Sequence, residues 1–173
     1  EGTENPQTIT IDTIKAVTAV FIKKKYALTI EVEGQGSVAE EVIKAGAATD
    51  YNSGTIVELT ASTGVEGWEF KEWTGDLTGT DNPAQITVIG GAKTVKAVFV
   101  KKQFAINITI EGEGGGTVAE EVVTGLKVDS KYEYGTELKL TATPSAEWVF
   151  KEWKGDVTGT ENPLQLTIDE TKN

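Results

Sequence analysis

The 173-residue chain contains no cysteine, no histidine and no methionine. Without cysteine no disulfide can form, and without histidine and cysteine neither a Ser-His-Asp nor a Cys-His nucleophile system can be assembled. The usual protein ligands of zinc and of the transition metals are missing for the same reason. We therefore predict that the chain is not an enzyme and that it holds no cofactor and no metal. The lack of thiols also suits a secreted bacterial protein.

Basic residues and long apolar runs are scarce. There are 16 Lys and Arg against 27 Asp and Glu, which gives a formal net charge of −11 at pH 7. This charge disfavours nucleic acid, because its binding depends on neutralising phosphates, and it disfavours an anionic membrane surface. No run approaches the roughly 18 apolar residues of a transmembrane helix. No signal peptide is recognisable either, and because Glu1 lies inside a motif we expect the natural start to have been removed.

The chain does contain a repeat. Residues 73–83, which run from Trp-Thr-Gly-Asp to Asn-Pro, recur as residues 153–163 after 80 residues, and the end of the motif also opens the chain at residues 2–6. Self-similarity at a fixed period marks an array of structural units. We predict three segments: residues 1–24 as the C-terminal strands of a preceding repeat, 25–101 as a repeat module, and 102–173 as a module lacking its last strand.

Strand patterns recur at matching positions of the copies. Apolar and polar residues alternate along residues 26–33 and again along 104–111, as in a strand with one buried face. Three further sets match in the same way: 57–61 with 138–142, 86–88 with 164–168 and 9–11, and 95–99 with 17–21. Residues 38–44 and 118–123 fit a strand or an irregular segment better than a short helical turn. The sequence therefore predicts an all-β fold, with tandem modules of five or six short strands in an elongated arrangement.

The units are joined without a flexible linker. Phe104 lies five positions after Phe99, and Tyr26 lies five positions after Phe21, with no Gly, Pro or Ser between. An odd step along a straight strand moves the inward side chain to the opposite face. We expect a twisted, stiff rod, unless a β-bulge at the joint cancels this step.

The two ends of the chain are out of phase with the units. The last unit stops at Asn173 without a counterpart of residues 94–99, whereas residues 16–22 have the sequence of such a strand. A missing strand leaves an open sheet edge and an apolar groove. Two alternatives remain open here. The leading strand pairs head to tail with another copy of the chain, or it folds back on its own neighbouring unit.

The four tryptophans are the strongest candidates for a binding site. Two pairs share a strand face and are expected in the core: Trp68 with Phe70, and Trp148 with Phe150. Trp73 and Trp153 lie at the opposite parity, just before the Gly-Asp loop, where an exposed indole could stack on a sugar ring. Core packing is the simpler explanation for large aromatic residues in a small domain.

The acidic clusters have simpler explanations than catalysis or metal binding. The loop that begins at Asp76, and its copy at residues 156–161, offers too few carboxylates for Ca²⁺ and fits Asx and Ser/Thr turns. Neighbouring glutamates at 40–41 and 120–121 point to opposite faces of a strand, so neither pair can serve one glycosidase site. We expect both pairs to keep a sheet edge charged and solvated.

The lysine clusters and the glycine-rich run are better explained by strand edges and turns than by ligand binding. The lysines at 23–25 and 101–102 could contact an acidic glycan, but edge lysines that discourage unwanted strand pairing explain them better. The glycines of residues 112–116 lack the Lys and Ser or Thr of a phosphate loop, so they predict a hairpin turn.

The order of the motifs resembles the divergent internalin-B B-repeat family, which is related to the Listeria–Bacteroides repeats of bacterial surface proteins. The motifs that carry the resemblance are Gly-Trp-Glu-Phe at 67–70, Trp-Thr-Gly-Asp at 73–76, Asn-Pro at 82–83 and Val-Lys-Ala-Val-Phe at 95–99, with a second set that ends in Trp-Lys-Gly-Asp at 153–156. The match covers essentially the whole chain. It departs at Ser62-Thr63, where the second copy has Thr143-Pro144, and at residues 145–147, where the second copy lacks the glycine before tryptophan.

The resemblance implies a small β-rich module, with a β-grasp-like arrangement as one option, on a secreted or surface-anchored bacterial protein. It implies no catalysis. We expect an extracellular spacer or stalk repeat that could also contribute to adhesion through a host or glycan ligand. The alternative is a glycan-binding module that uses Trp73 and Trp153.

Overall fold

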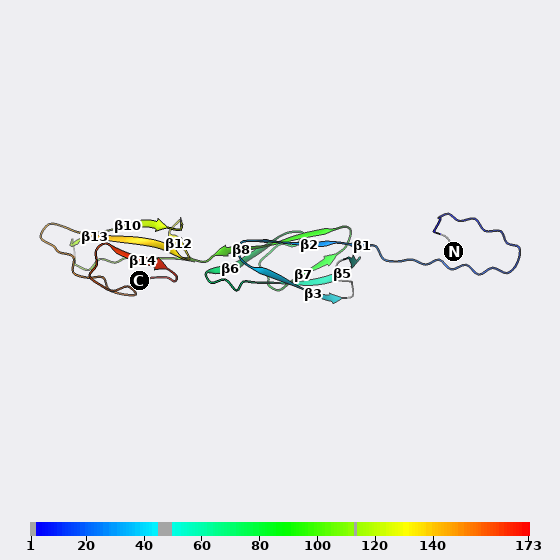
Figure 1. The fold of residues 1–173 in the computed structure, drawn as a ribbon, viewed down its shortest axis with the longest axis horizontal. Helices are drawn as coiled ribbons and strands as arrows, with labels where there is room; N and C mark the ends of the chain where they lie inside the picture. Colours follow the sequence, from blue (N-terminus) through cyan, green and yellow to red (C-terminus); the bar gives the residue numbers. More distant parts are fainter. Residues whose placement is uncertain (1–2, 45–49, 113) are drawn as a thin grey trace.

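The computed structural model describes residues 3–44, 50–112 and 114–173, and these residues contain strands and no helix. Two strand-rich bodies lie end to end, and the N-terminal segment extends away from the first of them (Figure 1). This confirms the predicted all-β, elongated repeat arrangement. Glu1 and Gly2 of the leading motif and Glu113 of the glycine turn lie outside the described residues. Within the described ranges, no helix is long and apolar enough to cross a membrane.

The described part of the first unit contains two three-stranded sheets and one short strand pair. Its strands are β1 (Lys25–Tyr26), β2 (Leu28–Glu33), β3 (Ser37–Lys44), β4 (Tyr51–Asn52), β5 (Thr55–Ser62), β6 (Trp68–Gly75), β7 (Ala84–Val88) and β8 (Lys93–Lys101). One sheet has the order β3-β5-β7 and is antiparallel, and the other has the order β2-β8-β6. The segment at 38–44, left open between strand and irregular structure, is therefore a strand.

Strand β8 is the central strand of its sheet. It pairs parallel with β2, where Val95 lies opposite Ile30, and antiparallel with β6. The side chains of Val95, Ala97 and Phe99 are at most 2% exposed. Together with inward residues of β5 and β7 they form one buried core, so β8 contributes both backbone pairing and apolar filling.

A register shift in β6 changes the expected position of Trp73. The pairing of β6 with β8 slips between Phe70 and Glu72, which is a bulge of one extra residue. As a result Trp73 faces the same side as Phe70, with ring centroids 4.9 Å apart, and is 1% exposed. The predicted opposite parity of these two aromatic residues was therefore wrong, because strict alternation does not allow for a bulge.

The second unit repeats only part of this plan. Its strands are β9 (Gln103–Phe104), β10 (Gly116–Thr124), β11 (Lys127–Val128), β12 (Lys131–Glu133), β13 (Thr136–Pro144) and β14 (Leu164–Ile168). The antiparallel sheet β10-β13-β14 corresponds to β3-β5-β7, and even the register shift near the end of β10 recurs. Strands β9 and β12 pair as β1 and β4 do.

The expected strand at 104–111 does not form beyond Phe104, and residues 148–155, the copy of β6, form no strand either. In the first unit both equivalent segments bond to β8. In the described second unit only Lys172 and Asn173 stand at that position, and Lys172 makes a single parallel bridge to Ile106. The alternating sequence is present in residues 104–111, but the partner strand that would satisfy its backbone is not.

Residues 3–24 form no strand in the described chain, and the counterparts of the buried β8 residues are exposed there. Val17 is 74% exposed and Phe21 91% exposed. The alternative in which this segment folds back on the neighbouring unit is therefore not observed. Pairing with another copy of the chain stays a prediction.

The packing around Phe99 gives a first testable prediction. A methyl group at Gly36 would overlap the Phe99 ring, whereas one at Gly64 would meet open space. We expect Gly36→Ala to destabilise the first unit by about 1–3 kcal/mol, because overpacking forces the buried ring to move. The matched control Gly64→Ala should change the free energy of unfolding by less than about 0.5 kcal/mol. Urea denaturation measures both, and equal effects of the two variants would contradict the description of this core.

Candidate functional site

The Gly-Asp loop of the first unit is held by Trp73. Its backbone N–H donates to the carbonyl of Gly79 at 2.8 Å, and its indole Nε1 donates to the carbonyl of Asp81 at 2.8 Å. The indole therefore has a polar partner although the ring is buried. Trp73 therefore holds the loop at two places, Gly79 through its backbone and Asp81 through its side chain.

Asn82 closes the loop onto the neighbouring sheet. Its side-chain oxygen accepts from the N–H of Ala61 at 2.9 Å, and its amide nitrogen donates to the Ala61 carbonyl at 2.7 Å. A side-chain amide thus pairs with both backbone groups of one residue near the end of β5, as an adjacent strand would. The loop is thereby linked to the sheet opposite the one that contains Trp73.

Asp76 anchors the start of β8. Its Oδ2 accepts from the N–H of Thr94 at 2.7 Å, its own N–H donates to the Thr94 carbonyl at 2.8 Å, and Lys93 Nζ lies 3.1 Å from Oδ1. The Thr94 N–H, and after it the Lys93 ammonium group, lower the pKa of Asp76. The oxygens that a Ca²⁺ loop would present are thus used to position a strand.

The second unit reproduces these hydrogen bonds of the tryptophan, the asparagine and the aspartate, whereas Lys172, the equivalent of Lys93, pairs with Asp169 and Glu170. Trp153 Nε1 donates to the Glu161 carbonyl at 2.8 Å, and Asn162 pairs with Ala142 at 3.0 and 2.7 Å. Asp156 Oδ2 accepts from the N–H of Asn173 at 2.7 Å, so Asn173 stands where Thr94 stands in the first unit. The anchor for a β8-type strand is therefore assembled in both units.

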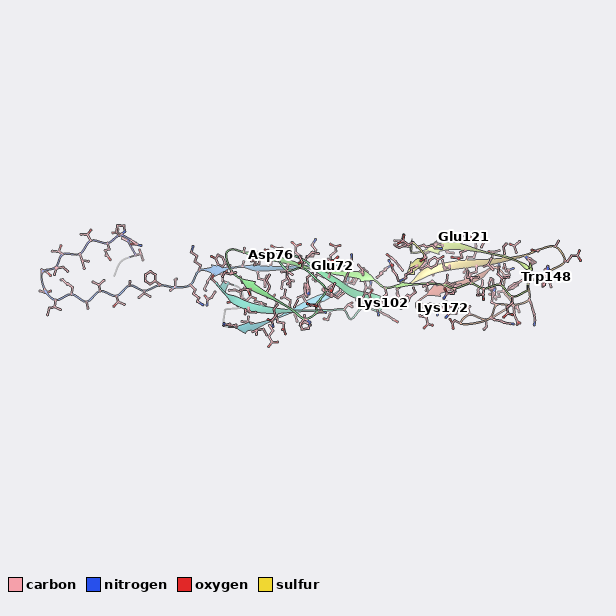
Figure 2. All side chains as sticks on the ribbon, turned by 180° about the vertical axis from the view of Figure 1, so that it is seen from behind. Glu72, Asp76, Lys102, Glu121, Trp148 and Lys172 are labelled. Atoms are coloured by element: carbon pink, nitrogen blue, oxygen red, sulfur yellow. The ribbon has the colours of Figure 1, made fainter. Side chains whose placement is uncertain are left out.

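Beyond that anchor the second unit has an open apolar groove of about 390 Å³. Its lining includes three isoleucines from the segment that matches β2 and three aromatic residues from the segment that matches β6: Ile106, Ile108 and Ile110, and Trp148, Phe150 and Trp153. Trp148 is 47% exposed and lies toward the far end of the unit (Figure 2). The prediction that Trp148 packs in the core is not met, since the strand that would cover it is absent from this position. We call this feature the β8 groove.

The junction between the units is held on both sides of Lys102. Its N–H donates to the Gly67 carbonyl of the first unit, and its carbonyl accepts from the N–H of Tyr134 in the second, both at 2.8 Å. Gly67 packs so closely on the Tyr134 ring that a methyl group there would overlap it. Lys101 also lies 3.7 Å from Glu133. Lys102 is visible between the two bodies in Figure 2.

The candidate ligand residues from the sequence do not lie in equivalent surroundings. Trp73 is enclosed beneath β8, whereas Trp153 is half-buried at the β8 groove. Each packs against the phenylalanine three positions earlier at about 5 Å. The two tryptophans belong to different units and form no shared aromatic platform. The structure therefore brings together Trp153, Trp148 and Phe150, a set that sequence analysis did not assign to one surface.

The glutamate pairs have a role that the sequence did not reveal. Glu40 lies on β3, an edge strand of its sheet, and Glu40 Oε2 accepts a 2.7 Å hydrogen bond from the hydroxyl of Tyr51. Burial, and after it Glu40, raises the pKa of Tyr51 to about 12. Glu120 and Tyr132 form the same pair in the second unit. One glutamate of each pair therefore satisfies a buried tyrosine, and neither arrangement provides a nucleophile with a base.

Loss of the two hydrogen bonds between Asn82 and Ala61 should destabilise the first unit more than loss of the matching bonds of Asn162 destabilises the second. Asn82→Ala leaves the N–H and carbonyl of the buried Ala61 without partners, and we expect a loss of about 1–3 kcal/mol in the first unit. Asn162→Ala is the matched variant. Because Ala142 is only half-buried, water can replace the amide and the loss should be smaller. Hydrogen exchange resolved by unit measures both, and a larger loss for Asn162→Ala would refute the comparison.

The Asp76 anchor predicts a pH dependence of stability. Because the pKa of Asp76 is lowered in the folded state, its stabilising contribution is present above the ordinary value of 3.8 and is lost as the pH falls through the folded pKa. The stability of Asp76→Asn should therefore fall less steeply with acid than that of the native chain. Urea denaturation across this pH window measures the difference. Asp81→Asn, which removes a charge from the same loop and leaves the contacts to Thr94 and Lys93 in place, is the matched control, and an unchanged slope for Asp76→Asn would contradict the assignment.

Comparison with known sequence families supports this repeated architecture. The family described as "Divergent InlB B-repeat domain" has a sequence model that matches residues 26–103 and, a second time, residues 106–172. Comparisons with curated proteins and with solved structures gave no significant match. The family is one of repeats in bacterial surface or secreted proteins. The two matched segments account for most of the chain and agree with the two structural copies, so the chain belongs to the divergent InlB B-repeat family as two tandem repeat modules.

Proposed function

We propose that the chain is a spacer segment of a bacterial surface protein, in which stiff repeat modules hold another part of that protein away from the cell envelope. The observation that carries this proposal is the junction at Lys102. One residue bonds to both units, and its neighbours Gln103 and Phe104 already pair with β12 of the second unit. A joint of this kind leaves no free residues to act as a hinge.

The repeat and the charge support the same function. Two modules with the same loop and the same strand anchor provide length rather than a single specialised site. The formal net charge of −11 is spread over an elongated chain, so repulsion between like charges favours extension and solubility. Placement outside the cell follows from the family and is part of this proposal. Adhesion to a host molecule stays a prediction, since no surface described above selects one ligand.

The alternative of a glycan-binding module has less support. It would need exposed aromatic rings beside a groove, and Trp73 is enclosed in the core of its unit. Trp153 is half-buried, and its indole already donates to Glu161. We also propose that the chain is not an enzyme, because the sequence holds no histidine or cysteine and the acidic residues discussed above serve tyrosines, backbone groups and lysines.

A distance measurement between the units tests stiffness. Because the chain has no cysteine, the double variant Thr60→Cys with Glu137→Cys can be spin-labelled at two exposed positions only, one on β5 and one on β13. We expect a single narrow distance distribution in dilute solution, because the Lys102 contacts fix the units relative to each other.

The control replaces Lys102 by the five residues Gly-Ser-Gly-Ser-Gly, so that no single residue bonds to both Gly67 and Tyr134. This replacement should broaden the distribution and leave the strands of each unit intact. If the native joint already gives as broad a distribution as the replacement variant, the joint is flexible and the spacer proposal loses its support.

A further inference from the structure

The joint around Lys102 (Figure 2) contains a side-chain contact that leaves no room for a larger residue. Gly67 is buried against the Tyr134 ring, and a methyl group at Gly67 would overlap the ring atoms. Partial burial, and after it a hydrogen bond to Glu66, raises the pKa of the Tyr134 hydroxyl. Two neighbouring residues of the first unit are therefore fitted to one tyrosine of the second.

The second unit repeats the turn that carries this glycine, but with different side chains. In both units the N–H of the tryptophan that follows donates to the carbonyl three residues earlier, at 3.3 and 3.1 Å. The residue before the tryptophan has a left-handed backbone in both, with φ of 76° at Gly67 and 69° at Glu147. Glu147 is therefore the counterpart of Gly67, and Ala146 is the counterpart of Glu66. In the second unit a side chain begins at the position where the first joint has room only for the tyrosine ring.

The position of Tyr134 differs between the units in the complementary way. The Ser53 N–H donates to the Lys24 carbonyl at 2.8 Å, just as the Tyr134 N–H donates to the Lys102 carbonyl at 2.8 Å. Ser53 is thus the counterpart of Tyr134, on the same backbone but without the ring. The first unit therefore has a small residue where the second unit has a large one.

The acidic residues of the two units are exchanged in the same sense. In the joint Lys101 lies 3.7 Å from Glu133, the residue that directly precedes Tyr134. The neutral Asn52 occupies the matching register position of the first unit. A carboxylate and a large side chain are thus supplied by the following module as Glu133 and Tyr134, or by the preceding module as Glu147 alone.

We propose that the residues at positions 67 and 134 form a matched pair that selects which module can follow another. A module with glycine at this turn accepts tyrosine, and a module with glutamate, such as Glu147, accepts a small residue and rejects tyrosine by a clash. The partner surface that fits the Glu147 turn is the Ser53 end of a module of the first type, where the lysines at 23–25 can receive the carboxylate.

This inference rests on the proposed function, since only modules joined into a stiff array need an order. It adds that the order is encoded in the joints. The backbone hydrogen bonds of the Lys102 type are common to both kinds of module end, and the side chains at the matched pair decide whether those bonds can form between two given modules.

A double-mutant cycle in the full chain, with spin labels at positions 60 and 137, tests the matched pair. Gly67→Glu should broaden the narrow distance distribution, because the new side chain and the Tyr134 ring cannot occupy the same space. Adding Tyr134→Ser to Gly67→Glu recreates the combination of Glu147 with Ser53 and should make the distribution narrow again. Tyr134→Ser alone keeps the backbone bonds of Lys102 and gives the width that the double variant should reach.

Gly64→Glu is the matched control, because it adds the same side chain to the same turn at a position that faces open space, and it should keep the native width. Recovery in the double variant also separates the clash from backbone strain, since glutamate stays at position 67 with its left-handed φ.

The outcomes distinguish this inference from the spacer proposal. If the native distribution is narrow and Gly67→Glu leaves it narrow, or if its broadening persists after Tyr134→Ser is added, the matched pair is overturned and the spacer proposal stands. If the native distribution is already broad, the joint is not fixed and both are overturned.

Discussion

The pairing of β8 with strands on both of its edges is the interaction on which the first unit depends. It joins β2 and β6, which are not bonded to each other, and it places Val95, Ala97 and Phe99 between the two sheets. The two copies make the dependence visible within one chain. Where β8 is present, one core encloses Trp73, and where only its first two positions are filled, the matching segments form no sheet and Trp148 is half exposed.

The parts of the second unit that form are those whose contacts do not involve a β8-type strand. Trp153 and Glu161 are eight residues apart, and Asn162 and Ala142 are twenty residues apart, and both contacts match those of the first unit. The segments that match β2 and β6, in contrast, have a β8-type strand as their partner, and in the second unit only Lys172 and Asn173 stand at its position. The loop motif therefore forms independently of β8 and holds the residue with which a β8-type strand begins, Thr94 in the first unit and Asn173 in the second.

The sequence predicted the strand-rich repeat and its family, but not the state of every strand. Alternation along residues 104–111 shows that these residues suit a half-buried strand, yet it contains no information on whether a partner lies beside them. The parity of Trp73 was misjudged because the bulge between Phe70 and Glu72 leaves no mark in the pattern. The hydrogen bonds between Asn82 and Ala61, and the one between Tyr51 and Glu40, join segments whose proximity only the fold reveals. A tyrosine and a glutamate that recur together in both copies were the one available signal for the latter contact.

Hydrogen exchange of the native chain, observed residue by residue, tests the central role of β8 most directly. We expect strong protection of those backbone amides in residues 28–33 and 68–75 that point toward β8, and rapid exchange at the matching amides in residues 108–111 and 148–152 of the second unit. The loop amide of Trp153, which bonds to Gly159, should stay protected. Equal protection of the two copies across these segments would show that the sheet forms without β8 and would contradict the account.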